Sequence, residues 1–262
     1  MFKNILICSF EGTGIGEPGA FFVYKGENMK LSRSQIKILA LMAMTLDHVA
    51  AIFLVPTSGA YLWMRFVGRL TAPVMSFFIA EGFHYTHDRI AYKERLLIFA
   101  LISQIPFMLV FDVYTPNVMM TLWLSVCILE TEMGVSSSQK NIRMLFLFTC
   151  ALVCDWMIFV PLWSLVFYKN RENIKRRDGL FALVGMSNIG LLMLEKALLG
   201  QGFQGMLYHL GYLLAIPVFH MYDGRKEQTG RFVKWGFYAY YPIHLLVLYF
   251  FGLIYFNGRE FY

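Results

Sequence analysis

The stretch KILALMAMTLDHVAAIFLV, residues 37–55, is long and apolar enough to cross a bilayer as a helix. The hydrocarbon core requires about 20 apolar residues in that conformation. Asp47 and His48 nevertheless lie just past the middle of the stretch. An ionisable group near the bilayer centre costs about 2.5–3.5 kcal/mol on insertion scales, so such groups usually mark functional sites. The stretch predicts a membrane span that carries a buried site, with a polar pair that only joins helices as the alternative.

The composition extends this prediction to the whole chain. Hydrophobic residues make up 58% of the 262 residues and charged residues only 15%, against about 25% charged residues in a soluble domain. The apolar residues fall into repeated long runs, which indicates an all-α, polytopic integral membrane bundle. We expect about nine transmembrane or partly re-entrant segments, near residues 36–55, 64–83, 95–112, 117–131, 142–155, 156–168, 179–199, 203–221 and 233–256.

The fourth, fifth and sixth segments are short for complete spans. The fifth and sixth meet at Asp155 and Trp156 with almost no loop, which predicts a tight hairpin or a broken helix. Irregular backbone at membrane depth is tolerated only inside the protein or against a water-filled cavity. We expect the junction to lie in one of these environments.

The lysine and arginine residues predict the orientation of the chain. With nine crossings and a cytoplasmic N-terminus, 19 of the 23 lysine and arginine residues lie on the cytoplasmic side, in agreement with the positive-inside rule. The C-terminus is then outside. Basic cytoplasmic loops explain the net charge of +6, so this charge does not indicate nucleic-acid binding.

The first 30 residues differ from the remainder. Their apolar run at residues 4–10 is too short for a signal peptide, and the glycine-rich stretch that follows lacks the ending of a phosphate-binding loop. Met29 begins MKLSRSQIK just before the first span. We expect residues 1–30 to be a disordered extension and residues 31–262 to form a single membrane domain.

Lys37 and His48 lie eleven residues apart in the first predicted span. At 100° per residue they are about 20° from alignment, so they share one helix face, about 16 Å apart along the axis. An anionic ligand with a long arm, such as coenzyme A, could place its phosphates near Lys37 and its reactive end near His48. The alternative is a lysine that only extends to the membrane interface.

Asp47 requires a partner on another helix, because its side chain diverges from that of its neighbour His48. Arg69, in the second-span motif RFVGRLTAPVMSFFIAEGF, is the leading candidate. Gly68 permits a close helix approach at this point. Arg69 is expected either to be paired structurally or to serve a charged ligand. Glu81, at the cytoplasmic end of the same span, is either a solvated charge or a polar wall of the site.

The last span contains Tyr241 and His244, three residues apart on one face. A buried neutral histidine suits general-base catalysis, and nearby arginine or tyrosine donors can stabilise an oxyanion. These residues fit acyl transfer and proton-coupled transport equally well. No metal site is expected, because His84 and His87 have a suitable spacing with Asp88 beside them, but no fourth ligand is in view.

Between Lys30 and Phe250 the chain contains, in this order, the blocks KILALMAMTLDHVAAIF, RFVGRLTAPVMSFFIAEGFHYT, YKERLLIFALISQIPF, PNVMMTL, CDWMIFVPLWSLVFY, MYDGR and FYAYYPIHLLVLY. This series resembles the TraX family, which includes the conjugative F-pilin N-acetylase. TraX proteins in turn are similar to the acyltransferase-three superfamily, which has a basic residue, ten residues and a histidine in the first span. That superfamily also has a late Tyr-x-x-His. In addition, it has a pair of arginines at the position where this chain has Lys93 and Arg95.

The resemblance implies an acyltransferase of the bacterial cytoplasmic (inner) membrane. Acetyl-CoA would enter from the cytoplasm and donate its acetyl group to an amine or hydroxyl acceptor in or across the membrane. The acceptor is a pilin in the family's known case, and a glycan, peptide or small amine remains open for this chain. Acetyl-CoA, the acceptor and membrane lipid are the expected partners, with neither a metal nor nucleic acid.

The same resemblance suggests roles for the polar residues. His48 would deprotonate the acceptor, which then attacks the thioester, while Asp47 and Arg69 hold the site and its charge balance. The expected catalytic residues are His48, Asp47, Arg69 and His244, and the expected cofactor-binding residues are Lys37, Arg95, Glu81 and Tyr241.

Two other classes of protein fit the residues. In a proton-coupled transporter or flippase, the buried acid, arginine and histidines would form a polar relay. In a non-catalytic assembly partner of a pilus or envelope complex, the same residues would only stabilise the fold. Acetyl-CoA binding distinguishes the acyltransferase from both.

Overall fold

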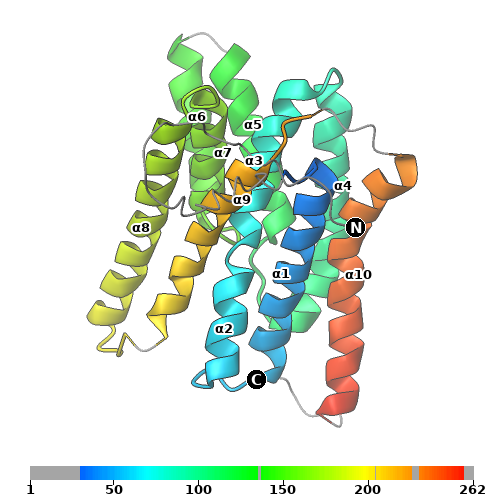
Figure 1. The fold of residues 1–262 in the computed structure, drawn as a ribbon, viewed down its shortest axis with the longest axis vertical. Helices are drawn as coiled ribbons and strands as arrows, with labels where there is room; N and C mark the ends of the chain where they lie inside the picture. Colours follow the sequence, from blue (N-terminus) through cyan, green and yellow to red (C-terminus); the bar gives the residue numbers. More distant parts are fainter. Residues whose placement is uncertain (1–29, 135–136, 204, 226–229, 257–262) are drawn as a thin grey trace, which may run out of the picture.

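A computed structural model describes residues 30–134, 137–203, 205–225 and 230–256, and within them the chain is all-α (Figure 1). An isolated bridge between Leu31 and Tyr222 is the β pairing found there. The helices are α1 (Arg33–Phe53), α2 (Gly59–Gly68), α3 (Thr71–Tyr85), α4 (Arg89–Phe111), α5 (Val118–Gly134), α6 (Ser137–Leu152), α7 (Phe159–Lys169), α8 (Ile174–Leu198), the 3-10 helix η1 (Met206–Leu214), α9 (Ala215–Met221) and α10 (Arg231–Tyr255).

The helices form a membrane bundle that corresponds to the nine expected segments. The second segment is two helices, α2 and α3, rather than one. The α-helical hydrogen-bond pattern is interrupted at Leu70, whose N–H donates to the Val67 carbonyl three residues back instead of four. The eighth combines η1 and α9. In the described part of the chain, four helices, α1, α4, α8 and α10, are long and apolar enough to cross a bilayer by themselves. The extension expected over residues 1–30 lies, except for residue 30, outside the described residues.

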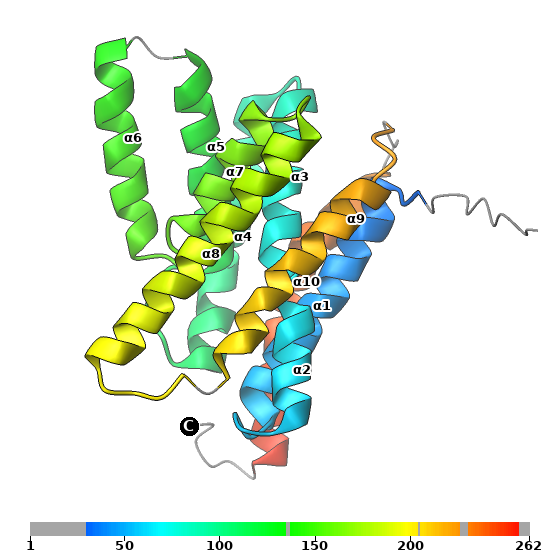
Figure 2. The same cartoon turned by 60° about the vertical axis from the view of Figure 1, so that its left-hand side comes forward.

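The junction between the fifth and sixth segments is a hairpin, because Lys140 near the start of α6 and Lys169 at the end of α7 both pair with Glu132. Helix α7 has 11 residues, about 16 Å of helix, which is roughly half of the hydrocarbon core. Figure 2 shows that α6 ends well above the lower ends of α1, α2 and α8, so the α6–α7 loop lies at intermediate height. Trp156 and Met157 in this loop have positive φ angles of 61° and 45°. The loop thus carries irregular backbone at membrane depth, as the sequence suggested.

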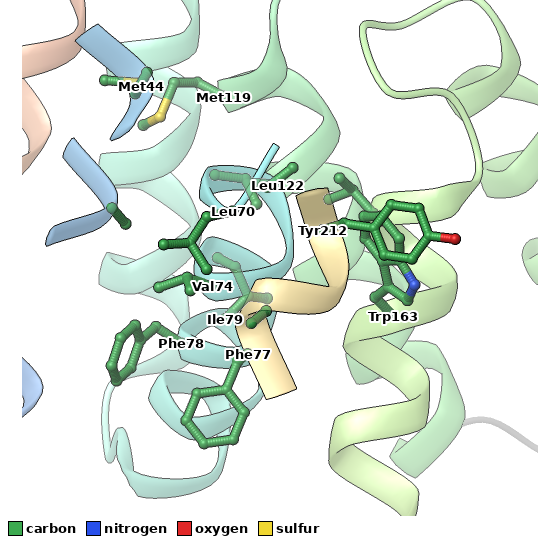
Figure 3. Close-up of a cluster of buried hydrophobic side chains, with 14 of the residues drawn as sticks. Met44, Leu70, Val74, Phe77, Phe78, Ile79, Met119, Leu122, Trp163 and Tyr212 are labelled. Atoms are coloured by element: carbon green, nitrogen blue, oxygen red, sulfur yellow. The ribbon is translucent and has the colours of Figure 1, made fainter. Parts of the chain in front are cut away.

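Helix α3 is the centre of the core. It packs against α1, α5, α7 and α9, and ten of its 15 residues are buried. A helix that is apolar on all sides fits only such a central position. Figure 3 shows Leu70, Val74 and Phe77 among the clustered side chains, together with Trp163 of α7 and Tyr212 of η1. The Trp163 and Tyr212 rings lie 5.8 Å apart.

Helix η1 crosses α2 at very short range. A Cβ atom built on Gly211 would lie 1.8 Å from the carbonyl oxygen of Phe66. Only glycine permits this contact between two backbones. A 3-10 run of nine residues is unusual in length, and the narrower 3-10 helix fits the limited space beside α2.

We expect Gly211→Ala to lower the thermal stability of the detergent-solubilised protein, because the new methyl group collides with main chain that cannot move independently. Overpacking costs about 1–3 kcal/mol. Gly190→Ala in α8 is the matched control, since nothing lies within 4 Å of its added Cβ. Thermal unfolding midpoints of the two variants would be measured side by side. Equal midpoints would contradict the expectation.

Candidate active site

Helix α1 begins with a well-formed cap that sets the position of its polar face. The Ser32 side chain accepts from the Gln35 N–H, and the Gln35 side chain accepts from the Ser32 N–H. The chain before the cap is tied to the end of α9 by the Leu31 N–H, which donates to the Met221 carbonyl at 2.7 Å. This arrangement holds the segment around Tyr222 beside the start of α1.

A cavity of about 400 Å³ runs beside α1. At the end of the bundle where α1, α4 and α10 begin, it is lined by Arg33, Lys37, Arg95, Arg225 and Lys234. Its apolar walls include Leu41, Met44, Met75, Ile79, Met119 and Leu122. At its inner end lie Asp47, His48, Asp155, Trp156 and Tyr241. Lys37 and His48 therefore line one cavity, as their spacing predicted.

Asp47 is the centre of a buried ion cluster between α1 and α2. Its carboxylate accepts from Arg69 at 2.6 and 2.7 Å and from Arg65 at 2.8 Å. The expected pair of Asp47 and Arg69 is thus confirmed. Gly68 is also required, because a Cβ atom there would lie 2.3 Å from the Asp47 Cβ. Removing these charges from water costs desolvation free energy, and only the attraction between the paired charges can offset that cost.

The ion cluster extends to the α6–α7 loop through Arg69. Its guanidinium lies 4.8 Å from the ring centroid of Trp156 and 5.7 Å from that of Tyr208, within range of a cation–π interaction. The backbone of neighbouring Asp155 is fixed on both sides: its N–H donates to the Pro116 carbonyl, and its carbonyl accepts from the Thr121 hydroxyl. The Asp155 side chain lines the cavity on this rigid loop.

His48 points away from Asp47 and contacts α10. Its Nδ1 lies 2.8 Å from Nε2 of His244, which is itself buried. One turn earlier in α1, the Thr45 hydroxyl lies 2.6 Å from the Tyr240 hydroxyl. The His48 ring also packs edge-on against Phe111 of α4, at 5.2 Å between centroids. Three helices therefore hold His48 at the inner end of the cavity.

The mouth of the cavity is rich in cationic groups with remaining hydrogen-bonding capacity. The Nε atoms of Arg33 and Arg95 are buried and have no hydrogen-bond partner in the part of the chain that the structure describes. The Lys37 ammonium lies between two rings, 5.4 Å from the centroid of Phe78 and 5.2 Å from that of Phe237. Such donors favour an anionic ligand with several acceptor oxygens.

The structure brings together most of the residues proposed from the sequence. Lys37, Asp47, His48, Arg95 and Tyr241 line the cavity. Arg69 and His244 lie directly behind its wall, bonded to Asp47 and His48.

Glu81 lies elsewhere: it is buried in an ion pair with Arg171 of the α7–α8 loop, at 2.9 Å, and does not line the cavity. The Arg171 guanidinium also contacts the hydroxyl of Tyr85, which does line the mouth. Glu81 therefore does not contact the cavity itself. Through Arg171 it holds Tyr85, a residue of the cavity mouth, in position.

Sequence reasoning left out several lining residues. Arg33, Arg225 and Lys234 join the mouth from three separate chain segments. Arg225 ends the block MYDGR. A charged residue at the end of such a block, outside the apolar segments, could have indicated a site residue. The sequence pattern places Asp155 only at the junction of two segments, although a carboxylate between two half-length segments is as costly in lipid as Asp47.

We expect Asp47→Asn to destabilise the protein by about 3–5 kcal/mol, because it leaves the buried Arg69 and the partly buried Arg65 without a counter-charge. Asp112→Asn is the matched control: this exposed residue has φ of 48°, a conformation that asparagine adopts readily. Denaturation in detergent would measure both. Equal stabilities would show that the ion cluster does not support the fold.

The chain is similar in sequence to two known proteins. A probable fimbrial assembly protein FimC, serogroup H1, of Dichelobacter nodosus is 34% identical over 239 residues, which cover 84% of this chain and 96% of that protein. An uncharacterized protein of Rickettsia prowazekii (strain Madrid E) is 33% identical over 98 residues, 35% of this chain and 34% of that protein. No solved structure matches significantly. The TraX protein family model matches residues 32–252, and the chain therefore belongs to the TraX family.

Proposed function

We propose that this protein is a membrane-embedded acyltransferase that moves an acetyl group from acetyl-CoA to an amine or hydroxyl acceptor. One observation carries the proposal. A single cavity joins five cationic side chains at one end of the bundle to His48 at membrane depth. This is the arrangement that a ligand with a polyanionic head and a long arm ending in a reactive thioester requires.

The residues present fit coenzyme A as the donor. Its phosphates carry several negative charges, which match the cations of the mouth and the Nε atoms of Arg33 and Arg95, which lack a hydrogen-bond partner among the described residues. The methionine- and leucine-lined middle section suits the uncharged arm. The distance along α1 from Lys37 to His48, about 16 Å by helix geometry, separates the phosphate end from the thioester end.

His48 is the general base of the proposed reaction. It takes the proton from the acceptor nitrogen or oxygen, which then forms a bond to the acetyl carbonyl carbon. The carbon–sulfur bond breaks as the tetrahedral intermediate collapses, and the proton passes from His48 to the departing thiolate. The Tyr241 ring lies 6.4 Å from that of His48 and its hydroxyl is our candidate donor to the oxyanion.

The proposed setting is the inner membrane of a bacterium, with the N-terminus in the cytoplasm and the C-terminus outside. The basic mouth supports this orientation, because it lies at the end that holds most of the lysine and arginine residues. The fimbrial assembly relative makes a pilin-type protein our first choice of acceptor.

A proton-coupled transporter is the second candidate. It is favoured by the direct contact of His48 with His244, since two joined imidazoles at membrane depth can pass a proton. Such a protein would have no need for acetyl-CoA. The following experiment therefore separates the two functions.

Purified protein in detergent, incubated with radiolabelled acetyl-CoA and a pilin-type acceptor, should transfer label, and His48→Ala should lose this transfer by about 10²–10⁴-fold. Acetyl-CoA binding, measured by calorimetry, should remain. His220→Ala is the control, because His220 is a half-exposed residue that pairs with Asp178 outside the cavity. Full transfer by His48→Ala would refute its role as base, and a wild type that does not bind acetyl-CoA would favour the transporter.

We further expect Arg95→Ala to raise the KM for acetyl-CoA about tenfold or more with little change in kcat, since one charge-assisted contact contributes about 1.5–3 kcal/mol. Arg176→Ala is the matched control, an exposed arginine at the same end of the bundle that does not line the cavity. Initial rates over a range of acetyl-CoA concentrations measure both. An unchanged KM for Arg95→Ala would exclude Arg95 from the donor site.

A further inference from the structure

His244 does not line the cavity among the described residues, yet it is hydrogen-bonded to the proposed base. Its side chain is buried, with 7% of its surface exposed. It therefore has no route to a ligand in the cavity. Any contribution to the reaction has to pass through His48.

The main chain determines which nitrogen of His244 carries a proton. Its Nδ1 lies 3.0 Å from the carbonyl oxygen of Tyr240, one turn earlier in α10. A carbonyl oxygen can only accept, so Nδ1 must carry the hydrogen and donate it. In a neutral imidazole the other nitrogen then has the lone pair. Nε2 of His244 is consequently an acceptor.

This acceptor determines the proton position on His48 in turn. Nε2 of His244 lies 2.8 Å from Nδ1 of His48. The two rings are inclined by only 9°, with centroids 5.0 Å apart, which suits an in-plane hydrogen bond. Nδ1 of His48 must donate in this bond. The lone pair of neutral His48 is then on Nε2, on the part of the ring directed away from His244, and His48 is a lining residue of the cavity.

His244 is needed because, among the residues that the structure describes, no other group forms a hydrogen bond with Nδ1 of His48. A free histidine side chain favours the opposite tautomer, with the proton on Nε2. Asp47, the nearest acid in sequence, gives both of its oxygens to Arg65 and Arg69. In many enzymes a carboxylate sets the tautomer of the catalytic histidine. Here a backbone carbonyl and a second histidine occupy that place.

A second contact holds the two helices in register. The Thr45 hydroxyl donates its one proton to the Leu41 carbonyl at 3.0 Å, so its contact of 2.6 Å with Tyr240 is a hydrogen bond donated by the tyrosine. This bond ties α10 to α1 one turn away from the histidine pair. It contributes to packing without touching either ring nitrogen, which makes Thr45 useful as a control.

We propose that His244 is a positioning residue, which, oriented by the Tyr240 carbonyl, keeps His48 in the tautomer whose Nε2 accepts the proton of the acceptor. The inference rests on the proposed acyl transfer for its kinetic consequence. The tautomer itself is a property of the resting protein. It can therefore be tested with and without turnover.

The kinetic test compares three variants. His244→Ala removes the acceptor and should lower kcat for acetyl transfer by about 10²-fold or more while leaving the KM for acetyl-CoA unchanged, since a base in the wrong tautomer loses much of its contribution. His244→Gln keeps an oxygen that can accept from His48 Nδ1 and should restore most of kcat. Thr45→Val removes the Tyr240 bond at the same interface and should keep kcat.

A chemical test needs no acyltransferase activity. Diethyl pyrocarbonate modifies the unprotonated nitrogen of an imidazole, and mass spectrometry of the α1 peptide reports the rate at His48. The wild type and His244→Gln should react at similar rates. His244→Ala should react several-fold more slowly at Nε2, because its His48 reverts toward the other tautomer.

The two tests separate the possible failures. If the wild type transfers no acetyl group but His244→Ala still slows the modification of His48, the proposed function fails and the positioning role remains. If His244→Ala matches the wild type in kcat and in modification rate, the inference is overturned. It is overturned equally if His244→Gln is as inactive as His244→Ala while both bind acetyl-CoA, because that result marks a purely structural residue.

Discussion

The buried ion cluster around Asp47 is the constraint on which the rest of the arrangement depends. One carboxylate holds two arginines of the second segment, and Gly68 lets the helices approach closely enough for this contact. Arg69 in turn lies over Trp156 and thereby links the α6–α7 loop to α1. Because an unpaired charge at this depth is so costly, the cluster fixes the positions of α1, the end of α2 and the α6–α7 loop relative to one another.

Adjacent residues on α1 divide structural and chemical roles between them. Successive side chains of a helix point about 100° apart, so Asp47 faces α2 while His48 faces α10. The ion cluster and the histidine pair thus lie on two sides of one helix, at the same level. Rotation of α1 about its axis would break both sets of contacts, and this explains how a residue beside a cavity can keep a defined orientation.

Much of this site could be predicted from the chain because it depends on spacing within one helix or on the cost of charge in lipid. Lys37 and His48 share a cavity for the first reason, and Asp47 meets Arg69 for the second. The contact of His48 with His244 joins residues 196 positions apart, and the sequence offers no period that relates them. Arg225 was left out and Glu81 was placed at the cavity for a similar reason, since their neighbours are set by loops rather than by helical repeats.

The short helices on one side of the bundle have a consequence for the surrounding lipid. Helices α6 and α7 measure about 24 and 16 Å along their axes, against a hydrocarbon core of about 30 Å. Lipid chains beside them must tilt or shorten to avoid leaving apolar surface uncovered, which thins the bilayer locally. The length of the acyl chains in the host membrane therefore affects the position of the loop that carries Asp155 and Trp156. Through this loop it affects the shape of the inner end of the cavity.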